Sequence, residues 1–368
     1  MRAVINRAEL LAAARRAASI APVASPVEVL KGVLLEMGRE SGTIAVTSTN
    51  LELSLVEWLS GAVGEDDAIV VNAKLFAQML EKLADDTVTL TREGNRPVLS
   101  LQSGTAEFTV PVFERGSYPR PDMPFPEDTV SVSGIPAMTR RTVFAASDNA
   151  KKPLLKCVNL MFTKDGLQAA STDGGCVVSA TGDKKSTGDI SLLLPAQSLE
   201  RLAAMISESD EFRVGTTGKN IVFYKQNFMF SARLMDGIFI DTKGLIDAIR
   251  NQFVVLSDVQ ELKHALHTVL PLAEGGKVEL EFQGQRLTFH CEGAYGKTKW
   301  TVETIPLTGA PNGTYAYLSR KLNACLSALS GPVKVGVAQD GMLTLATEDA
   351  FYMQRAMLPS AAKAKKAA

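Results

Sequence analysis

The chain has 368 residues, enough for two or three domains, and its 39 Lys and Arg are balanced by 40 Asp and Glu. Hydrophobic residues make up 46% and charged residues 21%, as in ordinary globular proteins. There is no apolar run of the roughly 18 residues that a membrane span needs, and no apolar signal core near Arg2, Arg7 and Glu9. Composition therefore excludes a membrane protein and predicts a cytoplasmic location. A net charge of −1 also excludes a uniformly basic nucleic-acid coat.

A short amphipathic segment recurs three times along the chain. In its first copy, Phe76, Met79, Leu80 and Leu83 stand at i, i+3, i+4 and i+7, which is one face of a helix. The copies begin 123 residues apart, and they are 71–83 (VNAKLFAQMLEKL), 194–206 (LPAQSLERLAAMI) and 317–329 (YLSRKLNACLSAL). Because three such steps nearly fill the chain, the sequence predicts one domain repeated three times.

Each repeat is also predicted to open with a helix and to contain antiparallel strands. The opening helices are expected at 7–19, at 135–147, and from an N-cap at Ser257 or Asp258 to about 270. The motif Ser48-Thr49-Asn50 and its copy Ser171-Thr172-Asp173 stand between strand-like runs at 43–47 and 51–58, and at 167–170 and 176–181. Hairpins with glycine at 94, 218 and 341 follow the recurring helices. The fold class is therefore α+β, with two helices packed on antiparallel sheet in each repeat.

Polar or proline-rich stretches separate the repeats. They lie at 117–128 and about 241–251, and the tail 360–368 is predicted to be disordered. The predicted domains are residues 1–121, 129–246 and 251–359. Cys157, Cys176, Cys291 and Cys325 lack any CxxC pairing and are expected to be reduced thiols.

The predicted helices carry more basic than acidic residues. Their acids are few (Glu9, Glu81, Glu200, Glu261), whereas acids gather in turns such as 65–67 and 85–86. For any single helix an ordinary solvated face is the simpler interpretation. All six predicted helices have this excess of basic residues, however. If they share one side of the protein, that side attracts the phosphates of a nucleic acid without reading its bases.

No catalytic centre, metal site or cofactor site is predicted. The three histidines are His264 and His267, at i and i+3 on one helix, and His290 beside Cys291, without a CxxC or HExxH frame. Gly296-Lys297-Thr298 resembles the end of a phosphate loop, but residue 291 is cysteine where that loop has glycine, and a strand follows. A long chain without a credible active site favours a scaffold.

The repeats and several motifs resemble the bacterial sliding clamp family, the beta subunit of DNA polymerase III. The similar segments are LKGVLLEM (30–37), TSTNLELSL (47–55), FAASDNAKKPLLKCVNLMF (144–162), STDGG (171–175) and FSARLMDGIF (230–239). The resemblance covers about residues 1–359. It implies the DNA clamp fold, a ring-forming head-to-tail homodimer around double-stranded DNA, and no enzymatic or 3'-5' exonuclease activity. It also implies a cytoplasmic, nucleoid-associated protein.

The resemblance assigns non-specific DNA contacts to the basic helices and nearby lysines. The candidates are Arg15, Arg16, Lys74, Lys82, Arg140, Arg141, Lys151, Lys152, Arg201, Lys263, Arg320 and Lys321.

The resemblance also implies a hydrophobic cleft between the second and third repeats. There the DNA polymerase, the clamp loader and repair proteins would bind through short linear peptides. The candidate cleft residues are Leu155, Thr172, Gly174, Gly175, Cys176, Val177, Ile240, Leu245, Tyr352, Met353, Gln354, Arg355, Ala356 and Met357. Plain core positions are an equally good interpretation of Leu155 and Val177.

The departures from the family pattern fall in this cleft. Gly175 and Cys176 stand where the family has an aromatic residue or histidine followed by arginine, and Gln354-Arg355 replaces Met-Pro. The Phe-Pro-Asp-Tyr pattern is 239–242 here, with Ile240 and Thr242. A basic residue is also lacking near 24–26. An accessory clamp with an altered set of clients is therefore an alternative to a main replicative clamp.

Two other classes of function remain as alternatives. One is a metal-dependent hydrolase acting on DNA with His264, His267, His290 and Cys291. The other is a protein-binding scaffold of three domains without a DNA role.

Overall fold

The computed structural model describes residues 1–94, 96–149, 151–163, 166–182 and 190–357. Contacts divide the chain into two compact units. Unit 1 comprises Met1–Val132, Arg201–Ile206 and Asp210–Leu234, and unit 2 comprises Ser133–Glu200, Ser207–Ser209 and the chain from Met235 onward. The predicted tail 360–368 lies outside the described residues.

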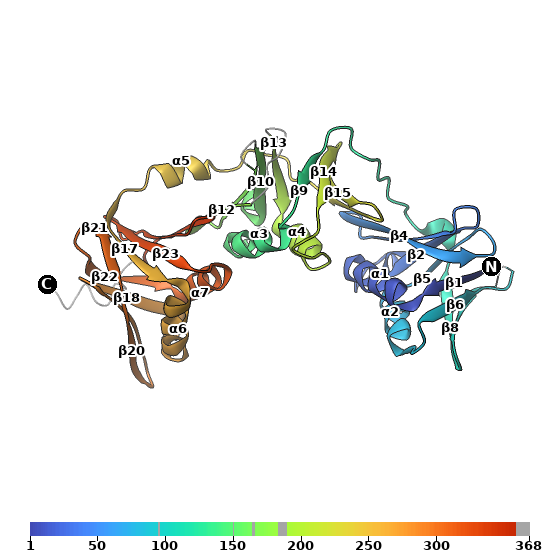
Figure 1. Cartoon of the computed structure of the whole chain (residues 1–368), viewed down its shortest axis with the longest axis horizontal. Helices are drawn as coiled ribbons and strands as arrows, with labels where there is room; N and C mark the ends of the chain where they lie inside the picture. The colour runs from blue at the N-terminus through green and yellow to red at the C-terminus, as the bar shows by residue number, and fades with distance from the viewer. Residues whose placement is uncertain (95, 150, 164–165, 183–189, 358–368) are drawn as a thin grey trace. The chain divides into compact units, whose positions relative to one another are not determined.

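Unit 1 is built on one antiparallel sheet. Its strand order is β1 (Arg2–Asn6), β6 (Thr87–Thr91), β7 (Val98–Ser103), β8 (Ala106–Phe113), β5 (Asp67–Asn72), β2 (Gly32–Gly38), β3 (Thr43–Thr49), β4 (Leu53–Val63), β16 (Phe228–Arg233), β15 (Asn220–Lys225), β14 (Phe212–Thr217) and β9 (Val130–Val132). Because β1 also pairs with β4, the first eight strands close on themselves. Helices α1 (Arg7–Ile20) and α2 (Ala73–Lys82) lie side by side against this sheet (Figure 1).

The core of unit 1 follows from the apolar periodicity of these helices. Phe76 and Leu80 of α2 are 1% and 0% exposed, and they join the same cluster as Leu10 and Ala14 of α1. Each helix begins at a side-chain cap, since Asn6 accepts the Glu9 N–H and Asn72 accepts the Leu75 N–H.

Unit 2 contains two antiparallel sheets. The first has the order β13 (Ile190–Pro195), β10 (Cys157–Thr163), β11 (Gly166–Thr172), β12 (Cys176–Thr181), β25 (Ala350–Gln354), β24 (Leu343–Ala346), β23 (Pro332–Ala338), β17 (Asn251–Asp258) and β21 (Ile305–Thr308). The second has the order β20 (Gly296–Glu303), β19 (Arg286–Gly293), β18 (Lys277–Gln283) and β22 (Asn312–Leu318).

The helices of unit 2 include α3 (Ile135–Thr142), α5 (Thr242–Asp247), α6 (Val259–Val269) and α7 (Ser319–Ala328). Helices α6 and α7 pack side by side, and α3 contacts both α7 and β12 (Figure 1). Helix α4 (Ala196–Ala203) spans the unit boundary in sequence. The short 3-10 turns are η1 (Glu28–Lys31), η2 (Arg115–Ser117), η3 (Val143–Ala145), η4 (Pro153–Lys156), η5 (Leu270–Leu272) and η6 (Glu274–Gly276).

The predicted helices are confirmed, with ends that differ by a few residues. Asp258, rather than Ser257, caps α6 by accepting the Gln260 N–H. The helix predicted at 135–147 is α-helical only to Thr142 and then tightens into η3. One prediction is wrong, because the expected linker at 241–251 contains α5, which Asp241 caps through the Gly244 N–H.

The sheets cross the predicted repeat boundaries. Strand β16 of the second repeat pairs with β4 of the first, with Phe230 opposite Leu55. Likewise β12 of the second repeat pairs with β25 of the third, with Val177 opposite Met353. Strands of the second repeat are thus shared between units 1 and 2. The boundaries at 121, 129, 246 and 251 stay a prediction from the sequence.

Candidate nucleic-acid and peptide interfaces

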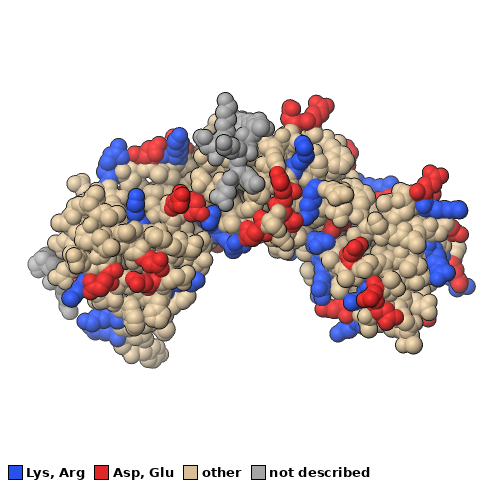
Figure 2. All heavy atoms as spheres, in the orientation of Figure 1, with Lys and Arg blue, Asp and Glu red and all other residues tan. Residues whose placement is uncertain are grey.

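The predicted DNA-contacting cations fall into two groups. Those of the first group are exposed and form no ion pair within the described part of the chain; they are Lys74, Lys82, Lys151, Lys152, Arg201 and Arg320, with the half-buried Lys263. Those of the second group already have a carboxylate partner; they are Arg15, Arg16, Arg140, Arg141 and Lys321. On the face shown in Figure 2, Lys and Arg are interspersed with Asp and Glu in both units.

Arg16 forms a two-point ion pair with a buried carboxylate. Its Nε and one terminal nitrogen donate to the two carboxylate oxygens of Glu57 at 2.7 and 2.6 Å, and the Glu57 side chain is only 2% exposed. Such a two-point pair stabilises a carboxylate that would otherwise be buried unpaired. Arg16 therefore pairs with a buried carboxylate. The neighbouring Arg15 pairs with the exposed Glu81 at 2.6 Å.

Lys321 does not lie where the sequence predicts. Its side chain is 10% exposed, and its ammonium donates to the Phe144 carbonyl at 2.7 Å and pairs with Asp173 at 3.2 Å. The expectation of a DNA-facing Lys321 is therefore wrong for this structure, because the ammonium is buried between α7, η3 and the loop before β12. Its neighbour Arg320 is exposed.

The loop before β12 is built around Asp173. Its Oδ1 accepts the N–H groups of Gly175 at 2.8 Å and Cys176 at 2.9 Å. Burial alone raises the pKa of a carboxyl, but these N–H groups and Lys321 outweigh it and hold the pKa of Asp173 below its ordinary value. Gly174 has a φ of 91°, which favours glycine. Asp173 is therefore an ionised carboxylate with fixed partners.

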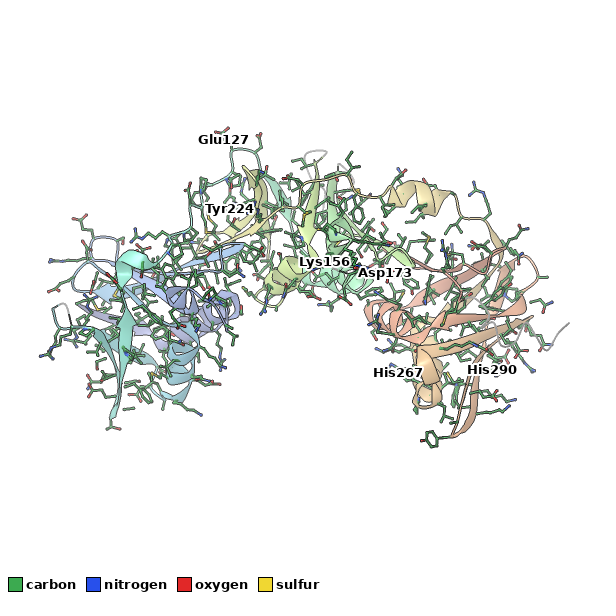
Figure 3. All side chains as sticks on the ribbon, turned by 180° about the vertical axis from the view of Figure 1, so that it is seen from behind. Glu127, Lys156, Asp173, Tyr224, His267 and His290 are labelled. Carbon is green, nitrogen blue, oxygen red and sulfur yellow. The ribbon has the colours of Figure 1, made fainter. Side chains whose placement is uncertain are left out.

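The predicted cleft residues divide into a buried floor and an exposed rim. The floor, at most 9% exposed, comprises Leu155, Thr172, Cys176, Val177, Tyr352, Met353 and Gln354. The rim comprises Gly174, Gly175, Ile240, Leu245, Arg355 and Met357, with Ala356 half-buried. Pairing of β12 with β25 sets Cys176 opposite Gln354, and the Arg355 N–H then donates to the Gly175 carbonyl at 2.9 Å. Figure 3 places Asp173 and Lys156 in this same part of unit 2.

The buried floor residues offer no reactive group. Burial and the neighbouring Asp173 raise the pKa of the Cys176 thiol to about 12, so it is neutral near pH 7. Gln354, at the position of the family's methionine, accepts the Tyr352 hydroxyl at 2.6 Å and donates to the Leu318 carbonyl at 3.2 Å. These side chains support the rim and offer no nucleophile.

Leu245 belongs to helix α5. It lines a depression of about 480 Å³ with Arg250, Ala338 and Met342, among others. The sequence also missed Leu154, which lies against Gly237 in the segment that leads to the exposed Ile238. Its place in the half-buried turn η4 carried no periodic pattern that could have identified it.

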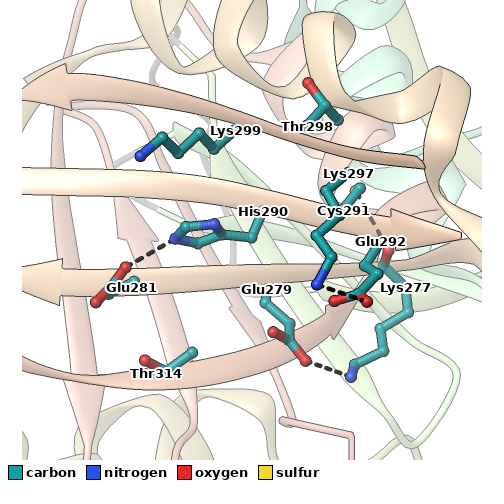
Figure 4. A pocket seen from close by; sticks show the side chains of 10 residues that line it. All are labelled: Lys277, Glu279, Glu281, His290, Cys291, Glu292, Lys297, Thr298, Lys299 and Thr314. Carbon is teal, nitrogen blue, oxygen red and sulfur yellow. Dashed lines mark hydrogen bonds and ion pairs between the residues drawn. The ribbon is translucent and has the colours of Figure 1, made fainter.

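The histidines proposed for the hydrolase alternative have separate partners. His267 Nε2 lies 2.8 Å from Asn323 Oδ1, and His290 Nε2 lies 2.7 Å from Glu281 Oε2. His290 and Cys291 line a depression of about 740 Å³ on the four-stranded sheet, among the pairs Lys277–Glu279 and Lys297–Glu292 (Figure 4). Within the described ranges, no group of three or more His, Cys, Asp or Glu is arranged to hold a metal ion.

Comparison with solved structures identifies the class of fold. The sliding clamp of Bacillus subtilis superposes with a TM-score of 0.88 at 18% identity, covering 98% of this chain and 99% of that one. A Pseudomonas aeruginosa sliding clamp bound to griselimycin superposes with a TM-score of 0.87 at 19% identity, covering 98% and 100%. The fold is therefore the DNA clamp fold that the sequence predicts.

Sequence comparison identifies the family. Residues 1–123 match the model of the DNA polymerase III beta subunit, N-terminal domain, and residues 129–241 match that of its central domain. The beta sliding clamp of B. subtilis is 24% identical over 267 residues, 68% of this chain and 69% of that protein. The beta sliding clamp of Streptomyces coelicolor is 24% identical over 292 residues, 77% of each chain. The chain belongs to the family of DNA polymerase III beta subunits, the bacterial sliding clamps, and the hydrolase alternative is not favoured.

None of the described helices is both long and apolar enough to cross a membrane.

Proposed function

We propose that two copies of this chain join head to tail into a ring that encloses duplex DNA and tethers a DNA polymerase and other clients. The observation that carries the proposal is the first group of cations, which form no ion pair among the described residues of a clamp fold. Five of them, Lys74, Lys82, Arg201, Lys263 and Arg320, lie on helices. Cations without acidic partners can approach phosphates and release counterions without reading bases. The ring holds DNA by topology, and the chain has no catalytic role of its own.

Open strand edges support the assembly of two copies. Strand β8 of unit 1 pairs with β5 only at Val112 and Phe113, which leaves the edge from Ala106 to Pro111 free on that side. Strand β20 of unit 2 pairs with β19 alone among the described strands. Exposed edges are normally covered in native proteins, and pairing β8 with the partner's β20 covers both.

The second part of the proposal concerns peptide binding. The rim around Gly174 and Gly175 and the exposed Ile238, Ile240 and Met357 form the surface that takes short linear segments of client proteins. A few apolar anchors carry most of the affinity in such grooves. The departures from the family pattern at Gly175 and Arg355 fall on this surface.

Retention on DNA tests the ring. A clamp loaded with its loader on a nicked circular plasmid is expected to remain bound through gel filtration and to be lost when the plasmid is cut once. Retention on the cut DNA would contradict a topological hold. The native mass should equal two chains, and a tight monomer would contradict the ring.

Charge substitution tests the DNA-facing helices. Replacing Lys74, Lys82 and Arg320 by Gln is expected to shorten retention and to reduce the slope of the salt dependence by about 0.9 for each duplex phosphate that is no longer neutralised. Arg39→Gln on the exposed turn between β2 and β3 is the matched control. Equal retention of the triple variant and the wild type would favour a scaffold without a DNA role.

A further inference from the structure

We propose that charged residues on the two open strand edges decide how two copies join, head to tail and in one register. Glu107 on β8 meets Lys299 of the partner subunit on β20, and each of these charges repels the same edge of a second copy. The inference rests on the ring proposed above and names the residues that select its contacts.

The open edge of β8 exposes the backbone groups of alternate residues. The Val112 N–H donates to the Pro97 carbonyl at 2.9 Å, so this pair bonds across the hairpin. Because bonding alternates along an antiparallel ladder, every second residue from Val112 back to the turn also bonds to β7. The open edge therefore carries the backbone groups of Glu107, Thr109 and Pro111, of which Pro111 has no N–H to donate.

The open edge of β20 follows the same alternation. The Thr304 N–H donates to the Gln285 carbonyl at 2.7 Å, which fixes the bonded pairs along β19 and β20. The residues whose backbone groups face the open edge are Lys297, Lys299, Thr301 and Glu303. A strand of a second copy can bond to this edge.

The edge of β8 presents one negative charge. Glu107 is the single charged residue in the hairpin from Val98 to Phe113. Its side chain is exposed, accepts the Ser100 hydroxyl at 2.8 Å and forms no ion pair with a described residue. A cation from another chain can therefore reach it without displacing a partner.

Lys299 is the corresponding cation on β20. Its side chain is exposed and forms no ion pair within the described part of the chain. The other charged side chains of this hairpin already have partners. These pairs are Lys297–Glu292 at 2.9 Å, Arg286–Glu303 at 3.4 Å and His290–Glu281 at 2.7 Å (Figure 4). The edge of β20 therefore presents one positive charge.

Proline and charge together select the register. Antiparallel pairing of Ala106–Val110 with Gly296–Trp300 of the partner subunit sets Glu107 directly opposite Lys299 of the partner subunit. Opposite charges at such positions attract. A slide of two residues toward the end of β20 keeps the bonding groups face to face but sets Pro111 opposite a backbone that needs an N–H. The first register is therefore favoured.

The same register brings apolar side chains together on the other face of the sheet. Trp300 is 40% exposed, and its ring meets the His264 ring of α6 edge to face with centroids 4.9 Å apart. Phe108 is half-buried against the core of unit 1. It lies diagonally across from Trp300 of the partner subunit in this register, within reach of an aromatic side chain. Apolar contact contributes affinity, and the ion pair contributes selectivity.

The same two charges oppose pairing of identical edges. A symmetric contact between two β8 strands brings two Glu107 side chains onto one face, and a contact between two β20 strands does so with Lys299. Like charges across neighbouring strands destabilise their pairing. Unlike edges attract instead, and one edge of each kind in every copy closes a ring of two.

The experiment measures dissociation of the dimer on dilution of the full chain, by sedimentation with fluorescence detection. Glu107→Lys and Lys299→Glu are each expected to raise the dissociation constant about tenfold, because like charges then face each other at both contacts. The controls Glu40→Lys and Arg39→Glu, on the exposed turn between β2 and β3, should change it by less than about twofold. Higher salt should reduce the effect of the edge variants.

Mixing the two edge variants tests head-to-tail pairing. In a mixed dimer one contact joins the two substituted edges and the other joins the two unchanged edges, so opposite charges meet at both. An equimolar mixture of Glu107→Lys and Lys299→Glu is therefore expected to dimerise as tightly as the wild type. The double variant Glu107→Lys/Lys299→Glu should do the same.

Three results would overturn the inference. Wild-type affinity in both single variants would remove the roles of Glu107 and Lys299 and leave the ring in place. Weakened single variants that do not rescue each other would show that these two residues are not partners. A wild type that stays monomeric would overturn the ring itself and this inference with it.

Discussion

Two loops of the molecule, one in each unit, are built on the same hydrogen bonds and differ in charge. In unit 1, Asn50 Oδ1 accepts the N–H groups of Glu52 and Leu53 at 3.0 and 2.7 Å. In unit 2, Asp173 Oδ1 accepts those of Gly175 and Cys176 at 2.8 and 2.9 Å. The repeat has kept the turn and exchanged a neutral amide for a carboxylate. The turn is therefore common to both units, whereas the negative charge in unit 2 has a partner of its own, Lys321.

The residue that follows Asn50 or Asp173 also differs between the two loops. Leu51 has a φ of 76° and is the one described residue other than glycine with a positive φ, and its side chain is 65% exposed. Gly174 takes the equivalent place with a φ of 91°. Unit 1 therefore tolerates a strained leucine, while unit 2 has an unstrained and open backbone where the peptide surface is proposed.

The largest effect is expected from removing Lys321. Lys321→Met leaves the half-buried Asp173 without its counter-charge and should lower the free energy of unfolding of unit 2 by about 2–4 kcal/mol. Amide hydrogen exchange at Gly175 and Cys176 should accelerate, while the unit 1 loop stays protected. Arg320→Met, the exposed neighbour, is the control and should change stability by less than about 0.5 kcal/mol. Similar losses in both variants would show that Lys321 is no more structural than Arg320.

Exchanging amide and carboxylate between the loops should have a smaller effect. Asp173→Asn keeps an acceptor for both N–H groups but removes the charge opposite Lys321, at a cost of about 1–2 kcal/mol. Asn50→Asp introduces a carboxylate without a buried lysine to pair with it, and it should change the free energy of unfolding by less than about 1 kcal/mol. Urea unfolding of the two variants measures both values, and an equal cost in the two loops would remove the proposed distinction.

The same pair predicts a pH dependence. Because the folded pKa of Asp173 is below its ordinary value, its contribution is fully present above the unfolded pKa, about 3.9, and is lost as the pH falls through the lower folded value. The stability difference between wild type and Asp173→Asn should therefore be constant from pH 7 to about 5 and shrink below about 4. A difference that grows on acidification would contradict this sign.

The backbone positions should respond in opposite directions. Gly174→Ala places a Cβ at a φ of 91° and should destabilise unit 2 by about 1–2 kcal/mol. Leu51→Gly relieves the strain in unit 1 and should stabilise it by a few tenths of a kcal/mol up to about 1 kcal/mol. Thermal melting of both variants would show this, and destabilisation by Leu51→Gly would mean that the exposed leucine makes contacts worth more than its strain.

The smallest difference is expected where the loops are alike. Thr49 Oγ1 donates to the Leu53 carbonyl at 3.0 Å, and Thr172 Oγ1 donates to the Cys176 carbonyl at 2.6 Å. Thr49→Val and Thr172→Val should each cost about 1 kcal/mol. Denaturant unfolding should give values within about 0.5 kcal/mol of each other, and a clear inequality would show that the shared turn is not equally important in both units.

The fold could be predicted because it depends on short-range patterns that repeat. Phe76 and Leu80 are buried as their helical spacing requires, and Gly341 has the positive φ of a turn glycine. Helix α5 could not be predicted in the same way because a helix of two turns has too little periodicity, although Asp241 offered a cap.

The site was harder to predict because charged side chains choose partners across the fold. Lys321 stands four residues before the buried Cys325, so its helical position already indicated the inner face. Its pairing with Asp173, 148 positions earlier in the numbering, could not be inferred from a charge pattern along one helix. The same holds for Arg16, whose partner Glu57 belongs to β4.

The sharing of strands between repeats constrains the order in which the molecule can fold as it is synthesised. Unit 1 contains Met1–Val132 but is complete only when the hairpins up to Leu234 have left the ribosome. Until then the edge of β4, from Leu53 to Glu57, awaits β16. In the meantime β12 emerges, and its second edge has no partner until β25 is made near the far end of the chain. Nascent chains of this protein therefore carry an unpaired strand edge for most of translation. A chaperone that covers such edges can act during this period.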